Sequence, residues 1–199
     1  MRARFTLIAI TLGLATAACM GGTKLTAVWK APGATSVKFN KVLVAVLSSD
    51  QLRRRVVEDR LVQRIANSTP SYKFLTEADV KDQAQARAKI QAGGFDGALI
   101  VRFVGTTKEE SYVPGASYWG PAPYATMWGY WGYGWGAVYS PGYMVSDTII
   151  TLESNVYSVS KDELLWSSRS ETMNPDSLND MMTSVIDATV KEMKKQKVL

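Results

Sequence analysis

The stretch Lys41–Leu47, with the sequence KVLVAVL, decides the fold because it is a nearly continuous apolar run of strand length. Such a run is typical of a strand that is buried on both faces of a sheet. A helical pattern follows directly, and either Ser49 or Asp50 can cap its first turn. This order of strand and helix favours an α/β architecture.

The helix after Asp50 is expected to be amphipathic. Its apolar stripe comprises Leu52, Val56, Val57, Leu61 and Ile65. Its outward, solvated residues comprise Arg53, Arg54, Glu58 and Arg60. The arginine run 53–55 could also indicate a phosphate site. Consecutive residues do not share a helical face, so a solvated helix surface is the favoured interpretation.

Further elements lie on both sides of this unit. An extended segment is expected at 25–29 and a second short strand at Tyr72–Leu75. Thr76 and Asp79 form a capping-box pattern that opens one helix over Glu77–Ala92, which Gly93 and Gly94 close.

The second half of the chain predicts three strands and a helix. The strands are expected around residues 98–104, 148–152 and 164–166, as an antiparallel meander. The final helix begins near Asn174–Ser177 and repeats apolar residues at i, i+3 and i+4, so it must pack on a sheet. We therefore predict a single α/β (α+β) domain over 24–199, with a mixed sheet, a three-strand meander and a C-terminal amphipathic helix.

The first residues of the chain have the composition of a signal peptide. Arg2 and Arg4 are followed by an apolar run over 5–14 and by the small residues Ala17 and Ala18, directly before Cys19. The run is too short to span a membrane. We expect a signal peptide at 1–18 and a short linker at 19–23.

Composition excludes several kinds of chemistry. The chain has no histidine, so His-based acid/base catalysis and most zinc and copper sites are unavailable to it. Loss of Arg2 and Arg4 with the signal lowers the formal net charge from +5 to +3, which is too mild to indicate nucleic-acid binding. We expect no cofactor, no metal and no catalytic residue.

The segment 111–146 contains no Asp, Glu, Lys or Arg, and it is rich in glycine and aromatic residues. It is expected to be a long loop between two strands, and loops of this length are usually functional or disordered. Its candidate binding residues are Tyr118, Trp119, Trp128, Tyr130, Trp131, Tyr133 and Trp135. Trp128, Trp131 and Trp135 in particular are expected to be exposed.

Four roles for this loop stay open. Its aromatic faces could stack on the sugar rings of peptidoglycan or another glycan, dip into the bilayer interface, or pair with another protein. It could also bind nothing specific. A hydrolase built from carboxylates and serines outside the loop is a further alternative, although no Gly-x-Ser-x-Gly motif supports it.

The residues around Cys19 resemble the lipobox of bacterial lipoproteins, with Thr16 in a position that is usually leucine. This resemblance implies that the Cys19 sulfur receives a diacylglycerol and that cleavage makes Cys19 the first mature residue, acylated with chains such as palmitate. In Gram-negative lipoproteins, Met rather than Asp at position 20 implies the outer membrane. The protein would then be tethered to that membrane and face the periplasm.

The strings Asp96–Val101, Leu152–Val159 and Leu164–Ser167, together with the Gly/Tyr-rich loop, resemble small uncharacterised bacterial envelope lipoproteins. The order of elements also resembles the α/β domain of the curli-secretion lipoprotein and of the lipoprotein activators of penicillin-binding proteins. The resemblance implies a non-enzymatic binding or assembly role with an envelope-protein or peptidoglycan partner.

Overall fold

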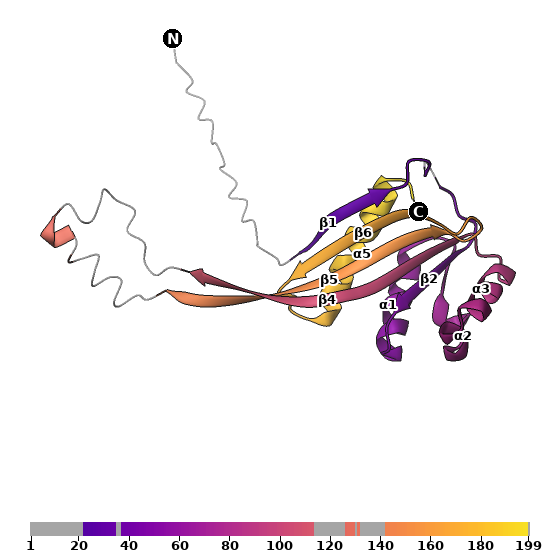
Figure 1. The fold of residues 1–199 in the computed structure, drawn as a ribbon, viewed down its shortest axis with the longest axis horizontal. Coiled ribbons are helices and arrows are strands. Elements are labelled where there is room, and N and C mark those ends of the chain that lie inside the picture. The colour runs from indigo at the N-terminus through magenta and orange to yellow at the C-terminus, as the bar shows by residue number, and fades with distance from the viewer. Residues whose placement is uncertain (1–21, 35–36, 114–125, 130, 132–141, 199) are drawn as a thin grey trace, which may run out of the picture.

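The computed structural model describes residues 22–34, 37–113, 126–129, 131 and 142–198 (Figure 1). Its elements in chain order are β1 (Thr23–Lys30), β2 (Val42–Leu47), α1 (Gln51–Arg64), β3 (Ser68–Pro70), the 3-10 turn η1 (Ser71–Lys73), α2 (Glu77–Lys81), α3 (Gln83–Ala92), β4 (Gly97–Val113), β5 (Tyr143–Ser158), β6 (Glu163–Met173) and α5 (Leu178–Lys195). Within these residues, no helix is both long and apolar enough to cross a membrane.

The strands form one mixed sheet in the order β1-β6-β5-β4-β2-β3. β2 is parallel to both β3 and β4, whereas β4, β5, β6 and β1 pair in antiparallel succession. The predicted α/β class, the mixed sheet and the C-terminal meander β4-β5-β6 are therefore confirmed. The strands of the meander extend beyond their predicted ends.

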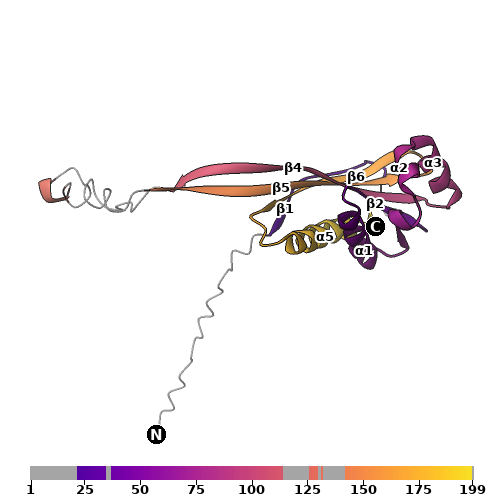
Figure 2. The same ribbon diagram turned by 90° about the horizontal axis from the view of Figure 1, so that it is seen from below.

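The main core lies between the sheet and the helices α1 and α5, which cover the same face (Figure 2). Trp166, Leu99 and Val156 are fully buried there on the strands. The predicted apolar stripe of α5 is confirmed except at Leu178, which is 46% exposed at the start of the helix. Its buried members are Met181, Val185, Ile186, Thr189, Val190 and Met193.

A smaller cluster covers the opposite face of β2 and β4. Leu43 and Ala98 meet Phe95 and Leu75 there, and the Lys41 ammonium lies 4.4 Å from the centre of the Phe95 ring. Val42, Val44 and Val46 face the main core instead. β2 is thus buried on both faces, as its apolar run predicts.

The predicted outward face of α1 is wrong at two residues. Arg54 and Glu58 are 6% and 0% exposed, whereas Leu52 is 73% exposed. Glu58 accepts hydrogen bonds from the Val46 N–H at 2.9 Å, the Tyr72 N–H at 3.0 Å, the Ser71 hydroxyl at 2.7 Å and the Arg54 Nε at 3.1 Å. Arg54 and Glu58 point inward because buried N–H and hydroxyl groups of β2 and η1 need a hydrogen-bond acceptor there.

The short strand predicted at Tyr72–Leu75 is also wrong. The third strand is Ser68–Pro70, and η1 follows it. The Phe74 and Leu75 N–H groups both donate to the Ser71 carbonyl, at 3.0 and 2.7 Å. These local hydrogen bonds and the Glu58 acceptor replace the partners that a strand would have provided.

The single helix predicted over Glu77–Ala92 is two helices. The capping box of Thr76 and Asp79 is present at the start of α2, as predicted. The helix breaks at Asp82, whose φ and ψ of −116° and 104° are extended and whose side chain caps the Ala84 and Gln85 N–H groups of α3. Aspartate favours such caps over helix interiors.

Candidate functional site

The largest departure from a compact shape is a two-stranded arm that projects from the sheet (Figures 1 and 2). β4 and β5 pair along their whole length. β2 pairs only with residues 97–102 of β4, and β6 pairs only with residues 149–158 of β5. We define the arm as residues 108–113 of β4 and 143–148 of β5, for which no third described strand supplies a neighbour.

Asn174 fixes the point where the arm leaves the sheet. Its N–H donates to the Thr148 carbonyl at 2.8 Å, and its side-chain oxygen accepts from the Thr148 N–H at 2.7 Å. Its side-chain nitrogen donates to Asp147 at 2.6 Å. Asn174 has a φ of 43°, in the left-handed region that asparagine tolerates better than most residues. The chain therefore turns away after β6 while the arm continues.

The middle of the arm is charged. Glu109 lies directly opposite Asp147, and Lys108 lies opposite Thr148. Charged side chains on a strand with an unpaired outer edge discourage nonspecific pairing with other chains, although like charges placed opposite each other weaken the ribbon. The middle of the arm thus resembles a solvated spacer.

The outer end of the arm is aromatic. Tyr112 and Tyr143 are each 62% exposed, and Met144 lies opposite Tyr112. A Cβ added at Gly142 would lie 2.2 Å from the Tyr112 hydroxyl oxygen, so only glycine fits beside that ring. The sequence predicts a loop at Tyr112 and Tyr143, because the segment 111–146 lacks charges. Residues 105–113 show no apolar/polar alternation, so the sequence carries no periodic signal for the longer strand.

Two of the predicted binding residues lie beyond the arm, in the described residues 126–129 and 131 (Figure 1). Trp128 and Trp131 are 72% and 57% exposed, as expected. Their rings contact edge to face, with centroids 6.3 Å apart. The Gly129 N–H donates to the Thr126 hydroxyl at 3.0 Å. The structure thus brings these two indoles together on one turn.

The remaining predicted site residues lie outside the described part of the chain. They are Cys19, Tyr118, Trp119, Tyr130, Tyr133 and Trp135. Their roles, including the lipidation of Cys19, stay predictions.

The perturbed carboxylates of the described chain have structural partners. Hydrogen bonds from Lys89 and Thr76 lower the pKa of Asp79 to about 2. Burial raises the pKa of Asp96, but hydrogen bonds from Asn40 and the Lys41 N–H outweigh it and leave that pKa lowered. Among the described residues, no three His, Cys, Asp or Glu side chains are grouped to hold a metal. These carboxylates stabilise turns and helix ends.

The fold and the arm together define a mixed α/β domain with a projecting two-stranded arm. Comparison with protein-family models and with curated proteins finds no match. Solved structures with a similar arrangement include two crystal forms of a PelC dodecamer from Paraburkholderia phytofirmans. One is 13% identical, covers 90% of this chain and 100% of its own, and has a TM-score of 0.43; the other is 10% identical, covers 89% and 99%, and has a TM-score of 0.43.

A third similar structure is a lipoprotein, GNA1162, from Neisseria meningitidis. It is 13% identical, covers 78% of this chain and 98% of its own, and has a TM-score of 0.39. At these TM-scores the likeness supports no inference about what this chain binds.

Proposed function

We propose that this chain is a non-enzymatic envelope lipoprotein that acts as a binding or assembly module through the end of its arm. The observation that carries the proposal is the position of exposed aromatic side chains at and beyond the end of a ribbon that leaves the sheet. These side chains are Tyr112, Tyr143, Trp128 and Trp131. An exposed group of this kind is typical of interaction sites.

The construction of the arm supports this role. An isolated two-stranded ribbon is only marginally stable, so the long arm adds little to the stability of the domain. The charged middle of the arm keeps the aromatic end away from the core. Aromatic side chains at such an end can bind a partner without disturbing the packed part of the sheet.

The proposed anchor is an acylated Cys19. Cys19 and Thr23 are separated by three residues, which span at most about 14 Å when fully extended. The Thr23 N–H donates to the Ser184 hydroxyl of α5 at 3.0 Å, so the described chain is attached to the domain from that point on. An acylated Cys19 would therefore hold the domain close to a membrane surface, with the outer membrane and a periplasmic orientation as the proposed location.

A non-enzymatic role is supported by the residue types available. The chain has no histidine, and the segment 111–146 has no charged residue that could transfer a proton. Glu58 and Ser71 are hydrogen-bonded to each other but fully buried, which favours a structural role over a hydrolytic one. The hydrolase alternative would need a carboxylate and a serine together at an accessible position.

The decisive experiment compares three possible partners. The full chain with Trp128, Trp131 and Trp135 replaced by Ala is tested for retention on peptidoglycan sacculi, on lipid vesicles and on envelope proteins, alongside the wild type. We expect loss of retention on one of the three, with a thermal midpoint within about 2 °C of wild type, because surface substitutions change stability by about 0.5 kcal/mol or less.

Trp29→Ala is the matched control, since Trp29 is an exposed tryptophan on β1 whose register partner Ser167 lies opposite Asn155, away from the arm. It should leave retention unchanged. Equal losses in both variants, or unfolding of the triple variant, would contradict the proposed role of the arm. Retention on sacculi would favour the glycan-binding alternative, because aromatic faces stack on sugar rings.

The anchor has a separate test. Cys19→Ala should leave the precursor uncleaved and without incorporated palmitate, whereas the wild type should be labelled and fractionate with the outer membrane. Normal processing of the variant, together with an unlabelled wild type, would refute lipidation at Cys19.

A further inference from the structure

A pocket of about 430 Å³ lies between α1, α5 and the strands β4 and β5. Its apolar walls include Val57 and Leu61 of α1, Phe103 of β4, Leu152 of β5, and Met182 and Val185 of α5. This volume is within the range of small-molecule sites, which are usually apolar with a few polar groups. The pocket is separate from the arm and lies under the covered face of the sheet.

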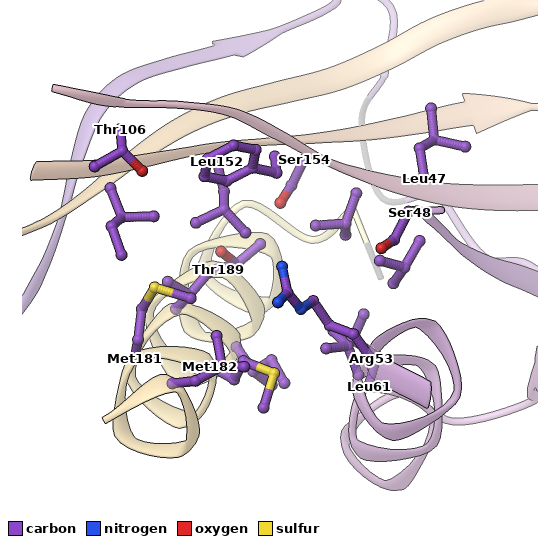
Figure 3. A pocket seen from close by; sticks show the side chains of 18 of the residues that line it. Leu47, Ser48, Arg53, Leu61, Thr106, Leu152, Ser154, Met181, Met182 and Thr189 are labelled. Carbon is purple, nitrogen blue, oxygen red and sulfur yellow. The ribbon is translucent and has the colours of Figure 1, made fainter. Parts of the chain in front are cut away.

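Three polar side chains reach into this apolar space from three elements. Figure 3 shows the Arg53 guanidinium extending from α1 into the pocket, the Ser154 hydroxyl directed into it from β5, and Thr189 on the facing side of α5. One cation and two hydroxyl groups are the donors that bind a carboxylate or a phosphate oxygen. Their convergence among apolar walls indicates a ligand with one anionic end.

Thr189 supplies an independent indication of a binding site. It is 2% exposed, and its hydroxyl has no hydrogen-bond partner among the described residues. Thr183 on the same helix donates to the Asn179 carbonyl at 2.9 Å, the usual arrangement for threonine within a helix. A buried hydroxyl without a partner is unfavourable, and here the unpartnered group lines the pocket.

Arg53 is also available to a ligand. Its ion-pair partner is Asp50, at 3.7 Å, and both side chains are about half exposed. Exposed pairs of this geometry contribute little stability. The other arginines of α1 that approach α5 have partners there: Arg60 with Asn179 and Arg64 with Asp187 at 2.9 Å. Arg53 therefore provides the pocket with a positive charge whose ion pair with Asp50 contributes little stability.

The rim of the pocket exposes apolar side chains. Leu47, Phe103 and Leu178 line the pocket, and each is among the large hydrophobic residues that the fold leaves exposed. An alkyl chain lying along them would remove this surface from water, and the flexible Met181 and Met182 side chains can adapt to it. The rim thus matches the apolar part of a ligand whose anionic end lies at Arg53.

We propose that this pocket binds a single acyl chain with an anionic head group. The Arg53 guanidinium and the Thr189 and Ser154 hydroxyls bind the head group, and the chain runs along Phe103 and Leu178. Free fatty acids and single-chain phospholipids share this chemistry. The site is independent of the arm, so it stands whether or not the arm binds an envelope component.

The test uses the full chain mixed with phosphatidylcholine nanodiscs. The probe is dodecanoate with a photoreactive diazirine at the end of the chain, and the matched probe is dodecyltrimethylammonium with the same diazirine. We expect dodecanoate to label peptides that contain Phe103 or Met181 about tenfold or more above the ammonium probe, because the Arg53 charge discriminates between the head groups. Competition by unlabelled dodecanoate or by lysophosphatidylglycerol then shows which source binds better.

Three variants sharpen the test. Arg53→Gln should lower dodecanoate labelling about tenfold, whereas Arg55→Gln should not, since Arg55 lies over the Tyr72 ring outside the pocket. Thr189→Val should lower labelling several-fold without lowering the thermal midpoint, because it removes a hydroxyl that has no partner among the described residues. A merely structural threonine would change the midpoint and not the labelling.

Labelling that is equal for both head groups, or that persists in Arg53→Gln, would overturn the proposal. A wild-type chain that is labelled only outside the pocket would also overturn it. The same holds if the pocket peptides crosslink to a second copy of the chain, since that copy would then be the occupant.

Discussion

The two ends of β4 belong to the same strand but are stabilised differently. Residues 97–102 have a strand on each side, and Leu99 and Val101 are buried in the core beneath α1 and α5. Residues 108–113 have only β5 beside them, and their side chains are exposed along most of this length. The same extended backbone thus buries its side chains in the core at one end and exposes them to solvent at the other.

The difference distinguishes the region that stabilises the fold from the region that we propose binds a partner. Burial of apolar side chains stabilises the inner end of β4, because each removes substantial surface from water. The arm has little apolar burial and two free edges, so it belongs to the least stable part of the structure. Regions of this kind can change their contacts when a partner binds.

The largest expected effect concerns the buried charges of α1 that bond β2, the strand beside the inner end of β4. Glu58→Gln should destabilise the domain by about 3–5 kcal/mol, since it leaves the buried Arg54 without its carboxylate. Chemical denaturation measures the loss, and Glu163→Gln, at an exposed position of β6, is the control. If Glu58→Gln lowers the free energy of unfolding by less than about 1 kcal/mol, the hydrogen bonds of Glu58 contribute little to the stability of the domain.

The next effect compares the two ends of β4 directly. Leu99→Ala should cost about 2–5 kcal/mol because it creates a cavity in the main core. Tyr112→Ala should change global stability by about 0.5 kcal/mol or less. Both are measured by denaturant unfolding of the full chain. Similar costs for the two substitutions would remove the distinction between core and arm.

The junction between the two ends is expected to have an intermediate effect. Asn174→Gly keeps the positive φ but removes the side-chain bonds to Thr148 and Asp147, at about 0.5–1.5 kcal/mol for each bond. Amide hydrogen exchange should become faster at Thr148, because its N–H donates to the Asn174 side chain in the wild type. It should stay unchanged at Leu99. Faster exchange at both positions would show that the arm and the core open together.

The smallest effect lies within the arm. Glu109→Thr relieves the repulsion with Asp147 opposite, and it should slow hydrogen exchange in the arm by an amount equivalent to about 0.2–1 kcal/mol. Glu110→Thr is the matched control, because Glu110 lies opposite Ser146. If the two variants exchange equally, the like-charge pair has no measurable effect on the ribbon.

Periodicity and local capping predicted much of the fold from the sequence. The apolar run of β2, the stripe of α5 and the capping box at Thr76 depend on residues close together in the chain. The exposure of Trp128 and Trp131 was predicted as well, because glycine and aromatic residues without regular spacing give a segment no core to join. Their binding role stays a prediction.

The inward orientation of Arg54 and Glu58 was decided only by the tertiary structure. Their four-residue spacing suits a solvated helix face equally well, and the donors that draw them inward lie on β2 and η1. The extent of the arm and the pocket around Thr189 likewise depend on which strands and helices end up adjacent. Sequence by itself determined the elements and their apolar faces, because those follow from neighbours along the chain. Tertiary structure decided which polar groups are buried and which strand edges are left without partners, because those follow from residues brought together by folding.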